Sequence, residues 1–247
     1  MELRVLSLYP DQMNIYADRG NILFLQRRCE WRGIGFVHSG AGLGESVDPA
    51  GHDLFYVGGG QDRDQRVVAA DMVASKREAL SAAADDGAVL LAVCGGYQLL
   101  GHSYQMGSEE LPGLGLADLT TVREPGERLI GNVAIEADLG IGPRLIAGFE
   151  NHGGRTYLGE AAQPLGKVVK GHGHGNNGRD GFEGVRRDNV FGTYLHGPLL
   201  PKNAWLADHL IALALERRYG ARPELEPLDD EFEAAAHRSA WQAAERG

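Results

Sequence analysis

Residues 88–98 of this 247-residue chain read AVLLAVCGGYQ. The apolar run ends at Val93, and a short continuous run of this kind is typical of a strand that is buried on both faces of a parallel sheet. Gly95 and Gly96 then open a helical pattern, so the chain turns sharply from strand to helix at Cys94. This turn predicts an α/β fold with a chemically interesting residue at the end of a central strand.

The first half of the chain alternates short apolar runs with helical patterns. The apolar runs cover residues 3–9, 33–38, 53–57 and 88–93. The helical patterns cover residues 21–32 and 64–86, where apolar side chains recur at helical spacing. Such alternation predicts a mostly parallel central sheet with right-handed crossovers and flanking helices.

The second half is richer in strand patterns. Short strands are expected at residues 130–136, 145–151, 167–169, 184–187 and 190–195, and helices at 203–219 and 229–245. The strands predict an antiparallel or mixed extension of the sheet. Because no linker, repeat or low-complexity segment divides the chain, we expect a single domain over residues 1–247.

The charge and the first residues exclude several classes of protein. The formal net charge is -10, and no basic cluster of the size that a nucleic acid needs interrupts this acidity. The first twelve residues contain no apolar stretch of the length of a signal peptide or a membrane helix. We therefore expect a cytoplasmic protein in which Cys29 and Cys94 are separate thiols, with Cys29 serving in packing.

Cys94 is the best candidate for a nucleophile. An elbow lifts the side chain out of the sheet, places it at the positive end of a helix, where a thiolate is favoured, and offers the Gly95 N–H to an oxyanion. The opposing interpretation is a small buried hydrophobic residue, which the Gly-Gly turn disfavours. A second turn, Gly58–Gly60, follows another apolar run and is expected at the same edge of the sheet, where it can supply a second oxyanion N–H. This turn matches no phosphate-binding motif.

A cysteine nucleophile needs a base, and His196 is the best candidate. It follows the strand pattern 190–195 and precedes a loop that leads into a helix. His152 is the second candidate, and it is equally suited to a turn that contacts substrate. His172 and His174 lie in a glycine-rich stretch, and their spacing is compatible with a metal, but without Cys or carboxylate ligands at set spacings a solvated loop is favoured. We expect no metal site in this chain.

These motifs resemble those of the class I glutamine amidotransferases, which have a flavodoxin-like fold and a Cys-His pair. The motifs are Cys94-Gly95-Gly96-Tyr97-Gln98, Gly58-Gly59-Gly60 and Tyr194-Leu195-His196-Gly197. A histidine motif without a following Glu is similar to the cobyric acid synthase branch. Longer stretches at residues 8–21, 148–156 and 175–181 resemble the glutaminase subunits of lipid II isoglutaminyl synthases, and the likeness runs nearly from end to end.

The resemblance implies a mechanism and a set of site residues. The thiol attacks the side-chain amide of L-glutamine, and the histidine moves the protons. The implied residues are the catalytic Cys94 and His196, the oxyanion donors Gly60 and Gly95, and the substrate-binding residues Arg128, Gln98 and Gly59. A guanidinium suits the carboxylate of an amino acid. No cofactor is implied for this chain.

One departure concerns the group that orients His196. Many class I glutaminases carry an acid two residues after this histidine, where the present chain has Pro198. The acid is then expected from the regions of Glu150 or Asp180, or from a partner chain.

The resemblance also implies a partner. Activation of a carboxylate needs ATP, and the chain has neither a phosphate loop nor the length for an additional synthetase domain. We therefore expect a heterodimer with a Mur-ligase-like synthetase subunit (MurT type) that binds ATP and Mg²⁺ and amidates the D-glutamate α-carboxyl of lipid II at the inner face of the membrane. Contact with the membrane is assigned to that partner, since the acidic chain has no basic amphipathic helix.

Three alternatives stay open. The first is a glutaminase that serves another acceptor, such as a cobyrinic acid derivative. The second is a flavodoxin-like cysteine peptidase, because the same Cys-His elbow serves peptides. The third is a catalytically silent scaffold, which the retention of both Cys94 and His196 disfavours. Ammonia release from free glutamine separates the glutaminases from the other two.

Overall fold

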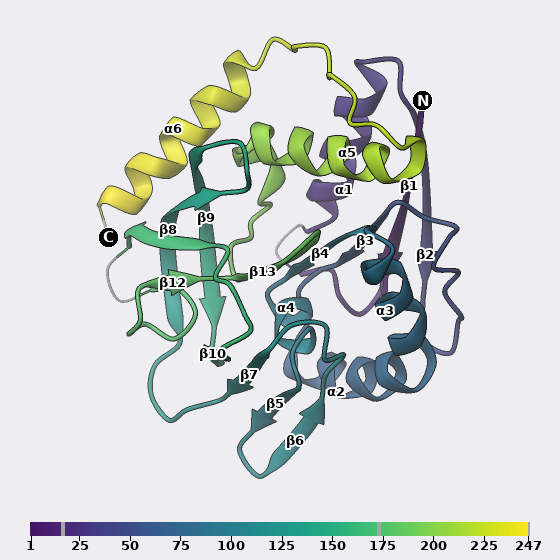
Figure 1. The fold of residues 1–247 in the computed structure, drawn as a ribbon. Coiled ribbons are helices and arrows are strands. Elements are labelled where there is room, and N and C mark those ends of the chain that lie inside the picture. The colour runs from purple at the N-terminus through teal and green to yellow at the C-terminus, as the bar shows by residue number, and fades with distance from the viewer. Residues whose placement is uncertain (16–17, 172–173, 247) are drawn as a thin grey trace.

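The computed structural model describes residues 1–15, 18–171 and 174–246 (Figure 1). The strands are β1 (Glu2–Leu8), β2 (Gly35–Ala41), β3 (Leu54–Val57), β4 (Val89–Val93), β5 (Ser103–Met106), β6 (Glu109–Pro112), β7 (Leu119–Val122), β8 (Leu129–Asp138), β9 (Pro143–His152), β10 (Arg155–Leu158), β11 (Gly166–Lys170), β12 (Phe182–Glu183), β13 (Val185–Arg187) and β14 (Val190–Thr193). The helices are α1 (Arg19–Glu30), α2 (Asp62–Asp71), α3 (Arg77–Asp85), α4 (Gly95–Leu99), α5 (Ala204–Tyr219) and α6 (Glu231–Glu245), with a π turn at Met72–Lys76 and a 3-10 turn at Leu200–Lys202.

A six-stranded sheet with the order β13-β14-β4-β3-β1-β2 forms the centre of the fold. All neighbouring strands in it are parallel except β13, which is antiparallel to β14. Alternate side chains of a strand face opposite sides of the sheet. In β4, Val89, Leu91 and Val93 join one buried cluster, whereas Leu90 and Ala92 join the other. The expectation of a central strand that is buried on both faces is confirmed.

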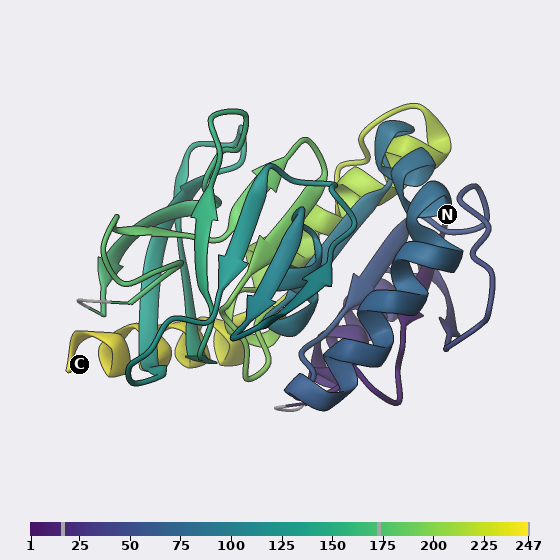
Figure 2. The same cartoon turned by 90° about the horizontal axis from the view of Figure 1, so that it is seen from below.

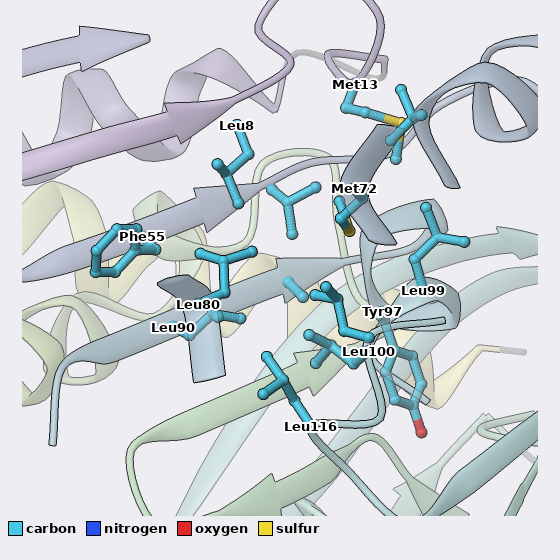
Figure 3. Packing of buried hydrophobic residues seen from close by; sticks show 14 of the residues in the cluster. Leu8, Met13, Phe55, Met72, Leu80, Leu90, Tyr97, Leu99, Leu100 and Leu116 are labelled. Carbon is cyan, nitrogen blue, oxygen red and sulfur yellow. The ribbon is translucent and has the colours of Figure 1, made fainter. Parts of the chain in front are cut away.

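Helices cover both faces of this sheet. On one face, α1 and α5 bury Leu25 and Leu210 in the first cluster. On the other face, α2, the π turn and α3 bury Met72 and Leu80 in the second cluster, part of which Figure 3 shows around Leu90. This arrangement of a mostly parallel sheet between helices confirms the predicted α/β class.

The expected helix over residues 64–86 contains the π turn. Within that turn Lys76 is fully buried, bonds to Asp71 at 2.7 Å and lies over the ring of Tyr9 at 4.7 Å from its centroid. A π turn inserts one residue into the helical repeat, so the regular spacing did not indicate the burial of Lys76. The contact anchors the end of β1, from which the chain runs toward the site described below.

The second half of the chain forms two further sheets instead of one extension of the central sheet. Their strand orders are β10-β7-β5-β6 and β12-β11-β8-β9, and only β13 and β14 join the central sheet. Each new sheet shares a buried cluster with the central sheet, through Tyr104 and Leu119 in the first case and through Val133 and Ile135 in the second. The β-rich character was predicted correctly, but its division into separate sheets was not.

The last helix, α6, covers the sheet that contains β8 and β9 (Figure 2). It buries Ala244 against Ala134 and Ala147. Near its start, Asp230 pairs with the fully buried Arg28 of α1 at 2.6 Å. Among the described residues, no helix combines the length and the apolar character that crossing a membrane requires.

We expect Leu210→Ala to lower the free energy of unfolding by about 2–5 kcal/mol, because it leaves a cavity between α5 and the sheet. Leu23→Ala is the matched control, since this leucine of α1 is 50% exposed and its loss should change stability by less than about 0.5 kcal/mol. Urea unfolding of both variants measures the difference. Equal effects would contradict the assignment of α5 to the core.

Candidate active site

Cys94 lies on a sharp turn between β4 and α4. Its backbone has φ 52° and ψ -107°, a conformation that costs a non-glycine residue roughly 1–3 kcal/mol. Gly96 permits the turn, because a Cβ at this position would lie 2.7 Å from the carbonyl oxygen of Val57. The Gly96 N–H donates to the Gly58 carbonyl at 3.0 Å. The elbow is therefore tied to the turn that follows β3.

Burial decides the protonation of the Cys94 thiol. Desolvation raises its pKa to about 12, the Asp18 carboxyl acts in the same direction, and the Gly95 N–H acts against it. The expectation that the elbow favours a thiolate is therefore wrong. The helix α4 has only five residues, and the loss of water outweighs its dipole. Cys94 rests as a neutral thiol and needs a base.

The turn Gly58–Gly60 lies directly beside the elbow. A Cβ at Gly95 would lie 2.9 Å from the amide nitrogen of Gly60, so the two expected oxyanion donors are neighbours. The segment that precedes α1 packs on the other side of the turn, where a Cβ at Gly58 would lie 2.5 Å from the Met13 carbonyl oxygen. The turn requires glycines because main chain approaches it from both sides.

Asp18 holds this turn in place. Its Oδ2 atom accepts the Gly59 N–H at 2.6 Å, and the residue is fully buried. Burial raises the pKa of Asp18 to about 7. Gly59 was predicted to bind substrate, and in the structure its N–H donates to Asp18 and fixes the turn.

His196 follows β14, the strand beside β4. Thr193 lies opposite Val93, and the Cys94 N–H donates to the Thr193 carbonyl at 2.8 Å, so Cys94 and His196 leave the sheet at the same edge. The backbone of His196 pairs with that of Phe149 in β9, at 2.9 and 3.2 Å. The histidine is thus held between two sheets.

The imidazole of His196 is fully buried. Desolvation, with the nearby His152 and Lys202, lowers its pKa to about 4. The ring is therefore neutral at physiological pH, which is the state that can accept a proton from a thiol.

Glu150 and Asp180, the two local acids considered for orienting His196, have other contacts. Glu150 Oε1 lies 2.6 Å from His174 Nδ1, and Oε2 accepts the Gly175 N–H at 3.1 Å. Asp180 Oδ2 accepts from Asn177 Nδ2 at 2.6 Å. His172 lies outside the described residues. The orientation of His196 by an acid stays a prediction.

A cavity of about 30 Å³ lies next to Cys94. The predicted site residues that line it are Cys94, Gly60, Gln98 and Arg128. The other residues that line it are Ile15, Asp62, Gln65, Tyr104, Asn151, His152 and Gly153. The structure therefore gathers these four predicted residues around one small space.

Arg128 is exposed at this cavity. Its Nε donates to Asn151 Oδ1 at 2.7 Å, and its Nη2 donates to the Asn151 carbonyl at 2.8 Å. Two bonds to one residue fix the plane of the guanidinium. A fixed guanidinium is suited to the carboxylate of a bound amino acid.

Gln98 is buried and belongs to a network beneath the cavity. Its Oε1 accepts from Gln65 Nε2 at 2.7 Å, and its Nε2 donates to the Tyr194 hydroxyl at 3.3 Å. Gln65 also donates to the Gly95 carbonyl at 3.2 Å. Gln65 was not predicted as a site residue, although a polar residue in line with the apolar face of its helix was a usable signal.

Neither cysteine forms a disulfide. Cys29 is fully buried with Ile22 and Leu25, as its helical spacing predicted. Within residues 1–15, 18–171 and 174–246, no group of three or more His, Cys, Asp or Glu side chains could hold a metal ion.

The sequence matches the family model described as a CobB/CobQ-like glutamine amidotransferase domain over residues 4–204. One similar protein is the lipid II isoglutaminyl synthase (glutamine-hydrolyzing) subunit GatD of Streptococcus pneumoniae, with 39% identity over 93% of this chain and 86% of the relative. The subunit of the same name from Staphylococcus aureus has 40% identity over 95% of this chain and 93% of the relative. The acivicin-bound glutaminase domain of Trypanosoma brucei CTPS shares the fold, with a TM-score of 0.54 and 12% identity over 91% of this chain and 98% of that chain.

We expect the alkylation of Cys94 by iodoacetamide to accelerate continuously from about pH 7 to pH 10, because the raised pKa of the thiol keeps the thiolate fraction rising throughout this interval. A rate that is half-maximal near pH 8.5 and levels off above about pH 9.5, as for an unperturbed cysteine, would contradict this view. Cys94→Ser is the control, because the fully buried Cys29 should react with the reagent far more slowly.

Proposed function

Because the chain belongs to the CobB/CobQ-like glutamine amidotransferase family, we propose that it is the glutaminase subunit of a lipid II isoglutaminyl synthase. Family membership makes it an enzyme that uses glutamine as amido donor. The acceptor is proposed from the two GatD relatives, whose matches extend over most of their own length. One observation supports the chemistry above all: Cys94 and Gly60 line the same cavity, and Cys94 and His196 follow two neighbouring strands of the central sheet.

The first half of the reaction forms a thioester. Glutamine binds with its carboxylate at Arg128 and its side-chain amide at Cys94. His196 takes the thiol proton while the sulfur attacks the amide carbon, and the N–H groups of Gly60 and Gly95 hold the oxyanion. The C–N bond then breaks, and His196 gives its proton to the leaving nitrogen. Neutral ammonia departs.

The second half hydrolyses the thioester. His196 accepts a proton from water as the water oxygen attacks the acyl carbon, and the oxyanion forms again at the same N–H groups. The C–S bond breaks, and the thiol of Cys94 recovers its proton. Because the pKa of His196 is low, the neutral imidazole that both steps require is present throughout the neutral pH range.

The ammonia is passed to a second subunit in this proposal. That subunit is a Mur-ligase-like synthetase that binds ATP and Mg²⁺ and amidates the D-glutamate α-carboxyl of lipid II to D-isoglutamine, a step of peptidoglycan synthesis. It contacts the lipid at the inner face of the membrane, while the present chain works in the cytoplasm without a cofactor. The acid that orients His196 is expected from this subunit.

Two other functions are less well supported. A glutaminase for a cobyrinic acid derivative is not favoured, because the GatD relatives match 93% and 95% of this chain. A cysteine peptidase is not favoured either, because the chain belongs to an amidotransferase family.

We expect Cys94→Ser to abolish glutamine-dependent amidation of lipid II by the two-subunit complex, and His196→Ala to lower its kcat by about 10²–10⁴-fold, because each variant removes a step of the thioester cycle. Supplied ammonium should restore amidation in both variants, since the synthetase subunit is unchanged. Mass spectrometry of lipid II measures the product. Glutamine-dependent amidation by Cys94→Ser would contradict the proposed nucleophile, and a wild-type complex that leaves lipid II unchanged would contradict the acceptor.

We expect Arg128→Ala to raise KM for glutamine by about 10- to 100-fold, the equivalent of roughly 1.5–3 kcal/mol for hydrogen bonds to a charged group. The effect should disappear with 4-aminobutyramide, which lacks the α-carboxylate. Arg66→Ala is the control, since this exposed arginine pairs with Glu109. An equal loss with both substrates would contradict the assigned carboxylate contact.

A further inference from the structure

Hydrolysis of glutamine to neutral ammonia leaves one proton behind. The amide and one water give a carboxylate, ammonia and a proton, since Cys94 and His196 both return to their starting states. The proton begins on the new carboxyl group of the product. If ammonia takes it, ammonium forms, which has no lone pair with which to attack an acceptor. The inference that follows rests on the proposed function, because only a glutaminase that delivers ammonia must export this proton separately.

A buried row of three ionisable side chains leads away from the glutamine cavity. His152 lines that cavity with Cys94, and its Nε2 lies 3.6 Å from Glu150 Oε2. The other oxygen, Oε1, lies 2.6 Å from His174 Nδ1. His152 and Glu150 are buried, whereas the side chain of His174 is 16% exposed. The row therefore connects the site with the surface.

His152, at the inner end of the row, has a ring nitrogen placed to accept a proton. The ring of His152 stacks on Tyr194 at 3.5 Å between centroids, which holds its orientation. Its Nδ1 lies 2.8 Å from the Gly154 carbonyl oxygen, which only accepts, so Nδ1 carries a hydrogen. The lone pair of the neutral ring is then on Nε2, a buried atom without a hydrogen bond among the described residues. A proton added there faces the Glu150 carboxylate.

His174, at the outer end of the row, is placed to release a proton to water. His174 lines a second cavity of about 450 Å³, together with the charged residues Lys170, Arg179 and Glu245. The Glu150 carboxylate raises the pKa of His174, and the two histidines lower the pKa of Glu150 despite its burial. These shifts favour an imidazolium at His174, which has a second N–H to give to water.

We propose that His152, Glu150 and His174 form a proton exit from the glutamine cavity to the outer cavity, so that ammonia leaves the site uncharged. The proton passes from the product carboxyl to His152 Nε2 and on to Glu150 Oε2, while His174 gives its Nε2 proton to water. Rotation of the protonated carboxyl group brings its hydrogen to the side of His174, and rotation of the His174 ring lets the bare nitrogen take this proton, which restores both groups. One proton enters, one leaves, and no other reactant is consumed.

His196 is not suited to this task. Its pKa of about 4 prevents it from retaining the proton at neutral pH, and it must be neutral again for the next turnover.

The exit also explains why β8 has a glycine at position 131. A Cβ at Gly131 would lie 2.7 Å from His174 Cε1, so the glycine makes room for the ring beside the strand.

The test measures the amide formed per glutamate released by the complex of the full chain with its ATP-dependent subunit. We expect a ratio near one for the wild type and a several-fold lower ratio for His174→Gln, with glutamate still released. Gly131→Ala should also lower the ratio, because it displaces the ring without removing an ionisable group. Imidazole in the buffer should restore the ratio of His174→Ala, an effect that a merely structural histidine would not show. His102→Gln is the control, since this exposed histidine pairs with Asp118.

The possible results separate the two ideas. A wild-type complex that forms no amide from glutamine overturns the proposed function and, with it, the need for the exit. If the wild type forms nearly one amide per glutamate and both His174→Gln and Gly131→Ala keep this ratio, the proton exit is wrong while the proposed function stands. A lowered ratio that imidazole does not restore also overturns it, because the histidine would then act only through the shape of its loop.

Discussion

The site depends on the close approach of main chain where β3, β4 and β14 end at one edge of the sheet. Gly96 bonds to Gly58, and Cys94 bonds to Thr193, so backbone hydrogen bonds join the three strand ends directly. No side chain fits between them at Gly96, and Cys94 accepts a strained backbone as a result. The N–H groups of the neighbouring turns are thereby fixed before any substrate arrives, which is the condition for electrostatic catalysis.

The same crowding excludes water from the reacting groups. Burial moves the pKa of Cys94 up and that of His196 down, so proton transfer from the thiol to the imidazole is unfavourable in the resting site. The transfer gives a thiolate at Cys94 and an imidazolium at His196. These charges have to be stabilised by the oxyanion donors on one side and by an acid beside the imidazole on the other. Since the oxyanion donors are already fixed, we expect a site of this kind to hydrolyse little glutamine until the acid is in place. The departure at Pro198 therefore agrees with a reaction that is controlled from outside this chain.

The elbow could be predicted because its determinants are consecutive: a buried strand, Cys94 and two glycines. The supporting network could not, because Gln65 and Asp18 reach the site from distant segments and their burial depends on tertiary packing. The thiolate was predicted wrongly because the sequence shows neither how completely Cys94 is buried nor that α4 stops after five residues. The strands β5, β6, β7 and β10 were missed since each has four residues and no distinct apolar run.

The position of His196 couples the central sheet to the sheet of β8 and β9. On one side, the buried Glu183 accepts the Tyr194 N–H at 2.6 Å and so holds the end of β14. On the other side, the backbone of His196 pairs with that of Phe149 in β9. The Asn203 side chain also holds β9, because its Oδ1 accepts the Ala147 N–H at 2.9 Å and its Nδ2 donates to the Ala147 carbonyl at 2.8 Å. His196 therefore lies on the link between the two sheets, and the backbone that carries it is held by hydrogen bonds from both of them.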